Sequence, residues 1–98
     1  MTEQGTGAEA VEAGARLKLL SRTYCHLCHD MERALEPLLA EARADGADLL
    51  LEILDVDSDP ALEERWGDLV PVLLAGEIEL CHYFLDVPKV REYLSRIG

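Results

Sequence analysis

The sequence predicts an α/β domain with the element order β-α-β-α-β-β-α, a four-stranded mixed sheet with helices on both faces. Two apolar runs, "RLKLLS" and "LLLEILDV", flank a stretch of helical periodicity and so predict a βαβ unit, whose strands are parallel. The later run "LVPVLLAGEIELCHYF" predicts two strands joined by a turn at a glycine, followed by a closing amphipathic helix. With 98 residues, 49% of them hydrophobic, the chain is long enough for one domain with its own core.

The first half of the chain divides at residue 15. Residues 1–15 are rich in Gly, Ala and Glu and predict a flexible tail, which leaves residues 16–98 for the folded domain. A strand is expected over 16–21, and a helix from Cys28 to Gly46, whose apolar residues recur on one face at positions 31, 35, 38, 39 and 42. Pro37 lies inside this helix and is expected to kink or divide it.

The second half alternates short strands and helices. Residues 49–56 predict a strand buried on both faces, and Asp59, Pro60 and Gly67 have the side chains expected at the start and end of a short helix. In the following hairpin, a turn at residues 75–77 would pair Leu74 with Glu79 and Val72 with Cys81. Tyr83 and Phe84 are expected in the core, and Asp86 is the expected cap of the last helix.

Charge and composition restrict the partners. The net charge is −11, with 20 acidic against 9 basic residues, which disfavours nucleic acid and anionic membranes. No run reaches the roughly 20 apolar residues of a membrane span. Because the N-terminus has neither the basic nor the apolar region of a signal peptide, we expect a cytoplasmic protein. We also expect a monomer.

The segment "SRTYCHLCHD" concentrates the reactive side chains. Cys25 falls where the first strand ends, and Cys28 falls in the first turn of the helix. A helix start offers free N–H groups and the positive end of the macrodipole, so it favours a thiolate, the attacking species in disulfide exchange. We therefore predict a lowered pKa for Cys25, with Arg22 as an auxiliary cation and His26 as a neighbour that helps when protonated.

A proline in the second half supports this interpretation. Pro71 follows Val70 inside an apolar strand run, although proline cannot donate to a sheet. The Val70–Pro71 bond is either a cis peptide bond or the start of an edge strand.

Together these segments resemble the thioredoxin fold, and its small glutaredoxin branch in particular, from about residue 17 to residue 97. "SRTYCHLC" resembles the glutaredoxin segment Ser-Lys-x-x-Cys-Pro-Tyr-Cys, and Val70–Pro71 matches the family's cis-proline dipeptide. The "VPVLLAG" to "FLD" spacing is similar to that of short bacterial glutaredoxin-like proteins. The resemblance implies Cys25 as nucleophile, Cys28 as resolving thiol and a substrate side formed by Arg22, Tyr24, His26, Val70 and Pro71, with no cofactor and no metal.

Departures from that pattern concern the substrate. His26 and Leu27 stand where glutaredoxins carry Pro-Tyr, and Tyr24 stands where thioredoxins carry Trp. "CHYFLD" replaces the glycine-rich stretch with which glutaredoxins hold glutathione. We therefore expect protein or low-molecular-weight thiols and disulfides as partners, with glutathione disfavoured.

Two alternatives remain open on the sequence. Cys25, Cys28 and His29, with Cys81 or His82, can supply zinc ligands, and the cysteine pair can hold an iron–sulfur cluster across a dimer. The chain can instead be a non-catalytic interaction domain of the same fold. Cys81 is a possible third redox thiol or a small apolar residue that fills the core.

Overall fold

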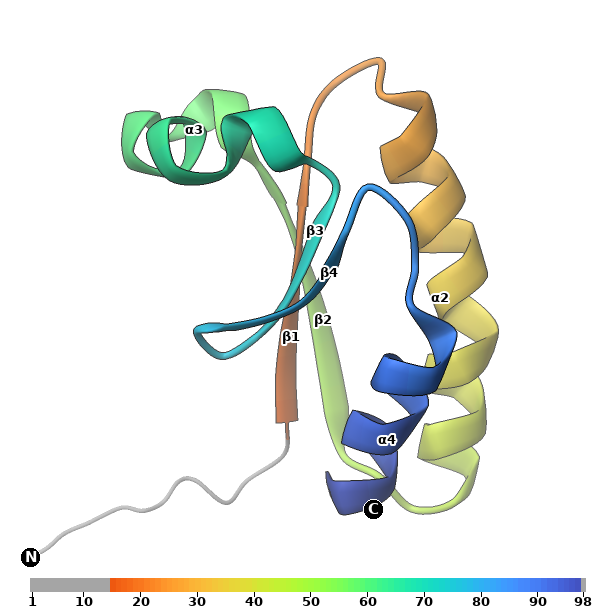
Figure 1. Cartoon of the computed structure of the whole chain (residues 1–98). Helices are drawn as coiled ribbons and strands as arrows, with labels where there is room; N and C mark the ends of the chain where they lie inside the picture. The colour runs from red at the N-terminus through yellow and green to blue at the C-terminus, as the bar shows by residue number, and fades with distance from the viewer. Residues whose placement is uncertain (1–14, 98) are drawn as a thin grey trace, which may run out of the picture.

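The computed structural model describes residues 15–97 (Figure 1). The expected N-terminal tail lies outside the described residues, apart from Ala15, which begins the first strand. The elements are β1 (Ala15–Ser21), α2 (His26–Ala44), β2 (Leu49–Asp55), the 3-10 turn η1 (Val56–Ser58), α3 (Pro60–Trp66), the 3-10 turn η2 (Gly67–Leu69), β3 (Val72–Ala75), β4 (Ile78–His82) and α4 (Val87–Ile97). This order confirms the β-α-β-α-β-β-α prediction.

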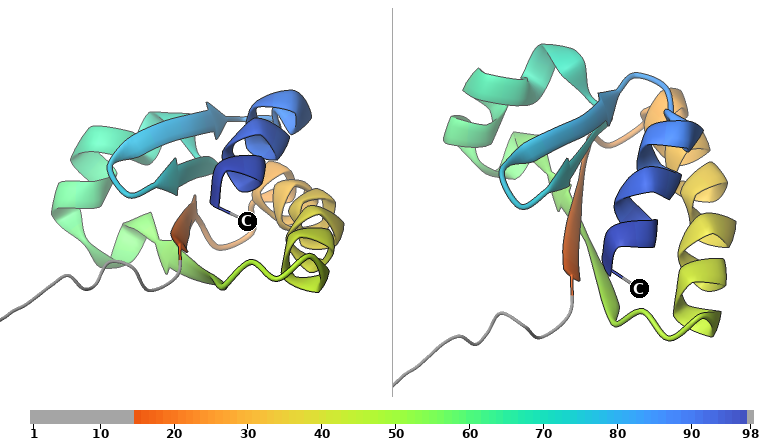
Figure 2. Two further views of the ribbon diagram at one scale, coloured as in Figure 1. Left: turned by 90° about the horizontal axis from the view of Figure 1, so that it is seen from below. Right: turned by 60° about the horizontal axis from the view of Figure 1, so that its bottom comes forward.

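The sheet is mixed, and its strands lie in the order β2-β1-β3-β4. β1 pairs with β2 in parallel and with β3 antiparallel, and the β3–β4 hairpin is antiparallel. Helices α2 and α4 lie on one side of the sheet and α3 lies on the other, as the views in Figures 1 and 2 agree. No helix within residues 15–97 has both the length and the apolar character needed to cross a membrane.

Alternation along β1 divides the core between the two faces. Leu19 packs into the larger cluster with side chains of α2 and α4, whereas the next residue, Leu20, packs into a smaller cluster with Val56, Val72 and Trp66. Successive side chains of a strand point to opposite faces, so consecutive leucines in a central strand serve both layers. All of β3 is buried for the same reason.

Strand β2 corrects one prediction, because it is not buried on both faces. It is the outermost strand on its side of the sheet and, within the described residues, pairs with β1 alone. Leu50 and Ile53 are consequently 54% and 46% exposed. A strand rich in leucine and isoleucine is typical of the centre of a sheet, and here it lies at an edge.

The hairpin corrects a second prediction. Leu74 pairs with Glu79 as expected, but Val72 pairs with His82 rather than with Cys81. The register shifts between Leu73 and Leu74, where β4 contains one extra residue, and Cys81 therefore lies opposite Leu73. Cys81 joins the larger core between the sheet and helices α2 and α4.

Helix ends follow the sequence closely. Asp59 caps α3 by accepting a hydrogen bond from the N–H of Ala61 at 3.0 Å, and Asp86 accepts one from the N–H of Lys89 at 3.1 Å. Helix α2 runs without interruption through Pro37, so the proline does not divide it. The helix begins two residues earlier than predicted, and this early start places both cysteines at its first turn.

Candidate active site

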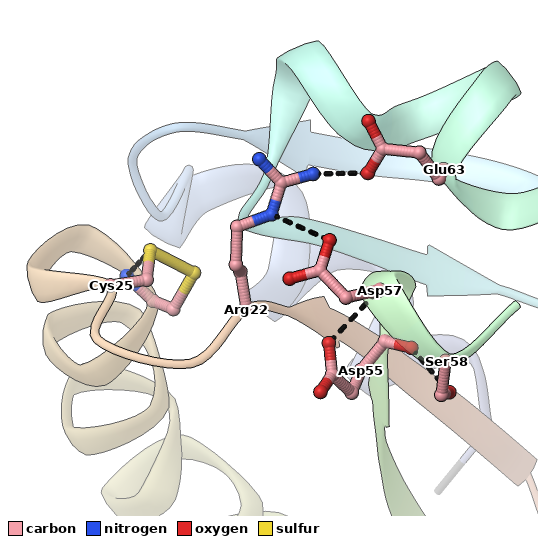
Figure 3. A network of polar contacts seen from close by, with 7 residues as sticks. Arg22, Cys25, Asp55, Asp57, Ser58 and Glu63 are labelled. Carbon is pink, nitrogen blue, oxygen red and sulfur yellow. Dashed lines mark hydrogen bonds and ion pairs between the residues drawn. A yellow bond between two sulfur atoms is a disulfide. The ribbon is translucent and has the colours of Figure 1, made fainter. Parts of the chain in front are cut away.

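The cysteine pair lies where β1 passes into α2. Cys25 is the N-cap residue of α2, in an extended conformation, and its Sγ accepts a hydrogen bond from the N–H of Cys28 at 3.0 Å (Figure 3). The two residues form a disulfide, with their Cα atoms 5.2 Å apart. Cys28 is 2% exposed, whereas Cys25 is half-buried. A substrate from solution therefore reaches the sulfur of Cys25 more easily than that of Cys28.

This geometry suits thiol chemistry after the disulfide is reduced. A helix N-cap is normally a serine, threonine or aspartate whose oxygen accepts from the N–H groups of the first turn. A thiolate on Cys25 would take the same hydrogen bond, with the positive end of the helix dipole beneath it. Both interactions favour the thiolate over the thiol, which carries no charge to stabilise.

An open cavity of about 550 Å³ surrounds the disulfide. Besides the two cysteines, its walls are formed by Ser21, Arg22, Tyr24, His26, His29 and Glu32. Tyr24 has a left-handed backbone (φ 61°), and its side chain is fully exposed. Five of the catalytic and substrate-side residues predicted from the sequence therefore line one hollow, namely Arg22, Tyr24, Cys25, His26 and Cys28, together with Glu32, which was not among them.

Arg22 lies in this wall, but acidic side chains hold its guanidinium. Its Nε is 3.3 Å from Oδ1 of Asp57, and its Nη2 forms a second ion pair with Glu63. The Nε contact lacks the direction of a hydrogen bond, so it is an ion pair only. In Figure 3 the guanidinium points toward Glu63 and Asp57 and away from the disulfide.

Val70 and Pro71 lie at the same end of the strands as the cysteines. Leu20 of β1 pairs with Val72, so the antiparallel register brings the residues before β3 alongside the end of β1. The Val70–Pro71 peptide bond is cis. The N–H of Tyr83 donates to the Pro71 carbonyl at 2.9 Å, which attaches the segment after β4 to this loop.

Tyr83 and Phe84 correct the expectation that they fill the core, because they are 40% and 69% exposed. The Tyr83 hydroxyl donates to the carbonyl of Asp68 at 2.8 Å, and the backbone of Tyr83 is left-handed (φ 65°). The sequence signal for this exposure is weak. This signal is that both residues follow the end of β4, where the alternation of inward and outward side chains along the strand stops.

The surroundings of Cys81 and His82 argue against a metal site that both residues share with the cysteine pair. Cys81 is buried, and burial raises the pKa of its thiol above the ordinary value of 9.0. His82 Nδ1 lies 2.6 Å from a carboxylate oxygen of Glu79. Within residues 15–97, no three His, Cys, Asp or Glu side chains converge as metal ligands would, and Cys81 does not line the cavity at the disulfide.

Comparison with solved structures places this geometry among known proteins. Protein Ne2328 from Nitrosomonas europaea is 32% identical, with a TM-score of 0.69 and coverage of 95% of this chain and 98% of that one. Target protein XcR50 from X. campestris is 37% identical, with a TM-score of 0.58 and coverage of 84% and 99%. NrdH-redoxin from Escherichia coli, described as a glutaredoxin-like protein, is 21% identical, covers 85% and 95% with a TM-score of 0.52, and shares the fold.

Family models give the same answer for nearly the whole domain. No curated protein is similar enough to this chain to count as a match. The family model described as a glutaredoxin-like domain (DUF836) matches residues 16–95, which include the cysteine pair and every element from β1 to most of α4. The chain has a thioredoxin-like fold with a Cys-x-x-Cys disulfide, and it belongs to the glutaredoxin-like domain (DUF836) family.

Proposed function

We propose that this protein is a thiol–disulfide oxidoreductase in which Cys25 is the nucleophile and Cys28 the resolving thiol. One observation carries the proposal: the half-buried Sγ of Cys25 caps helix α2 and accepts the N–H of Cys28, whose own sulfur is buried within bonding distance. A cap of this kind stabilises a thiolate at an accessible position and keeps a second thiol next to it. The reaction belongs in a compartment whose thiols are kept reduced, such as the cytoplasm.

The reaction moves two electrons from the dithiol to the substrate. The Cys25 thiolate attacks one sulfur of a substrate disulfide, forms a mixed disulfide and releases the first substrate thiolate. The Cys28 thiolate then attacks Sγ of Cys25, closes the disulfide and releases the second substrate thiolate. A low-molecular-weight or protein dithiol reduces the pair for the next cycle.

Substrate contacts come from exposed groups around the cavity. Tyr24 and His26 flank the reactive sulfur on the solvent side. Val70 and Pro71 form the loop at the same end of the strands. Cys81 takes no part, because its buried thiol is held in the core on the helix side of the sheet. Arg22 contributes through its ion pairs with Asp57 and Glu63.

An equilibrium redox titration tests the assignment. The protein is poised in buffers of defined dithiol-to-disulfide ratio, alkylated and weighed intact, with peptide mapping to assign each thiol. We expect Cys25 and Cys28 to exchange two electrons together, and Cys28→Ser to accumulate a one-to-one mixed disulfide on Cys25. Cys81→Ser is the matched control and should leave the titration unchanged.

Two outcomes would contradict the proposal. If Cys25 and Cys28 oxidise independently of each other, no dithiol couple exists. If both resist alkylation until a chelator is added, the pair holds a metal.

A further inference from the structure

The active-site cavity contains one side chain of permanent positive charge, and that charge is already compensated. Among the described residues that line the cavity, Arg22 is the one arginine or lysine. Its guanidinium is ion-paired with both Asp57 and Glu63 (Figure 3). A substrate carboxylate approaching Cys25 would therefore meet a guanidinium whose charge two carboxylates already balance.

The local structure gives both acidic partners room beside Arg22. The turn η1 holds the backbone of Asp57, because the N–H of Asp57 donates to Oδ1 of Asp55 at 2.9 Å. In the same turn, Ser58 Oγ donates to the Asp55 carbonyl at 2.7 Å. The Glu63 carboxylate lies directly over Gly67, where the Cβ of any other residue would collide with it. Glycine at this position therefore leaves the space that Glu63 needs to meet Arg22.

The resulting balance of charge is negative. Asp57 and Glu63 pair with the one guanidinium at the cavity, and Glu32 adds a third carboxylate to the cavity wall, in a chain with a net charge of −11. Such a field attracts cationic reactants and repels anionic ones, most strongly at low ionic strength.

We infer that Asp57 and Glu63 set the charge preference of this site, so that disulfides in basic surroundings are favoured substrates and disulfides of anionic thiols are disfavoured. The inference rests on the proposed function and assigns a substrate class to it: disulfides of cationic low-molecular-weight thiols and of lysine- or arginine-rich polypeptide segments. Asp57 and Glu63 act as positioning residues, because they contact Arg22 and not the reacting sulfurs.

Three small disulfides of similar size separate charge from shape. Cystamine is cationic, 2-hydroxyethyl disulfide is neutral and 3,3′-dithiodipropionate is anionic. The reduced protein, freed of excess reductant, is mixed with each in turn at about pH 8, above the usual titration range of histidine, and the formation of its disulfide is followed. Each rate is divided by the rate of free 2-mercaptoethanol with the same disulfide, which removes the intrinsic reactivity of the probes.

The decisive variant is Asp57→Asn/Glu63→Gln, which keeps the shapes of both side chains and frees the charge of Arg22. We expect its preference for the cationic over the anionic probe to fall by about three- to tenfold relative to the unmodified protein. The double variant should react faster with the anionic probe, and adding Arg22→Gln should remove this increase in rate. The single variants Asp57→Asn and Glu63→Gln should show probe preferences between those of the unmodified protein and the double variant. They provide the test if the double variant does not fold.

A matched control removes equal charge elsewhere. Glu41→Gln/Glu92→Gln also raises the net charge by two, at ion pairs with Arg91 and Arg96. Glu41 is thirteen residues beyond Cys28 on α2, or about 20 Å along the helix, which exceeds the screening length of roughly 10 Å at 0.1 M salt. This control should leave the probe preference unchanged.

The outcomes divide cleanly. A preference for the cationic probe that weakens from about 20 mM to about 500 mM salt, and that is lost in the Asp57 and Glu63 variants, supports the inference. Equal normalised rates for all three probes, or the same change in the Glu41 control, would overturn it while leaving the oxidoreductase assignment intact. Failure to react with any of the disulfides would overturn both.

Discussion

Replacing Leu35 by alanine tests how helix α2 is held against the sheet. Leu35 is completely buried and shares its core with Leu17 and Leu19 of β1 and Val90 of α4. Large-to-small substitutions at such sites lose both transfer free energy and contacts around the new cavity, about 2.7–5 kcal/mol for Leu→Ala. We expect a loss of about 3–4 kcal/mol, a large share of the roughly 5–15 kcal/mol typical of a domain.

The same variant is informative about the redox site. Leu35 lies seven residues after Cys28, two helical turns from the disulfide, so we expect the oxidised and reduced forms to lose the same stability. The reduction potential should then move by less than about 10 mV, since 30 mV corresponds to about 1.4 kcal/mol for this couple.

Urea unfolding of both redox forms and one redox titration measure these quantities, with Glu36→Ala as the control on the exposed side of the helix. A loss below about 1 kcal/mol would refute the packing argument. A shift in potential above about 30 mV would show that the packing of α2 depends on the redox state.

Two further predictions concern a thiol and a helix cap. Burial raises the pKa of Cys81 above 9.0, so the folded protein retains this proton longer than the unfolded chain does; the free energy of unfolding should fall as pH rises above that value. Cys81→Ala should flatten this fall above pH 9.0. The part of the fall that remains should come from Tyr93, whose pKa burial also raises. An unchanged slope of unfolding free energy against pH, measured by urea unfolding, would count against the prediction. Asp59→Ala removes the cap of α3 and should cost about 1 kcal/mol, whereas Asp59→Asn should cost only a few tenths; equal losses in the two variants would mean that the side-chain oxygen is not what stabilises the helix.

Much of the candidate site could be read from local sequence. The position of Cys25 and Cys28 at a helix start follows from the change of apolar period after residue 28, and Asp59 and Asp86 are recognisable as caps from residue type alone. These features depend on backbone stereochemistry and on neighbours within one or two helical turns.

The errors share a different origin. A one-residue bulge moved Cys81 from the expected pairing with Val72 into the core on the α2 and α4 side, and one residue of register is enough to send a side chain to the opposite face. Tyr83 and Phe84 are aromatic, which predicts burial on average, yet they follow the end of β4 and are 40% and 69% exposed.

The amino-acid sequence by itself determined the order of the elements, the helix caps and the chemistry available at the cysteine pair, because periodicity, turn residues and reactive groups are local properties. Only the tertiary structure decided that β2 is an edge strand and that Arg22 meets Glu63, 41 residues away. Such contacts depend on how separate elements pack, and the charge that a substrate meets at Cys25 is the sum of groups that only packing brings together.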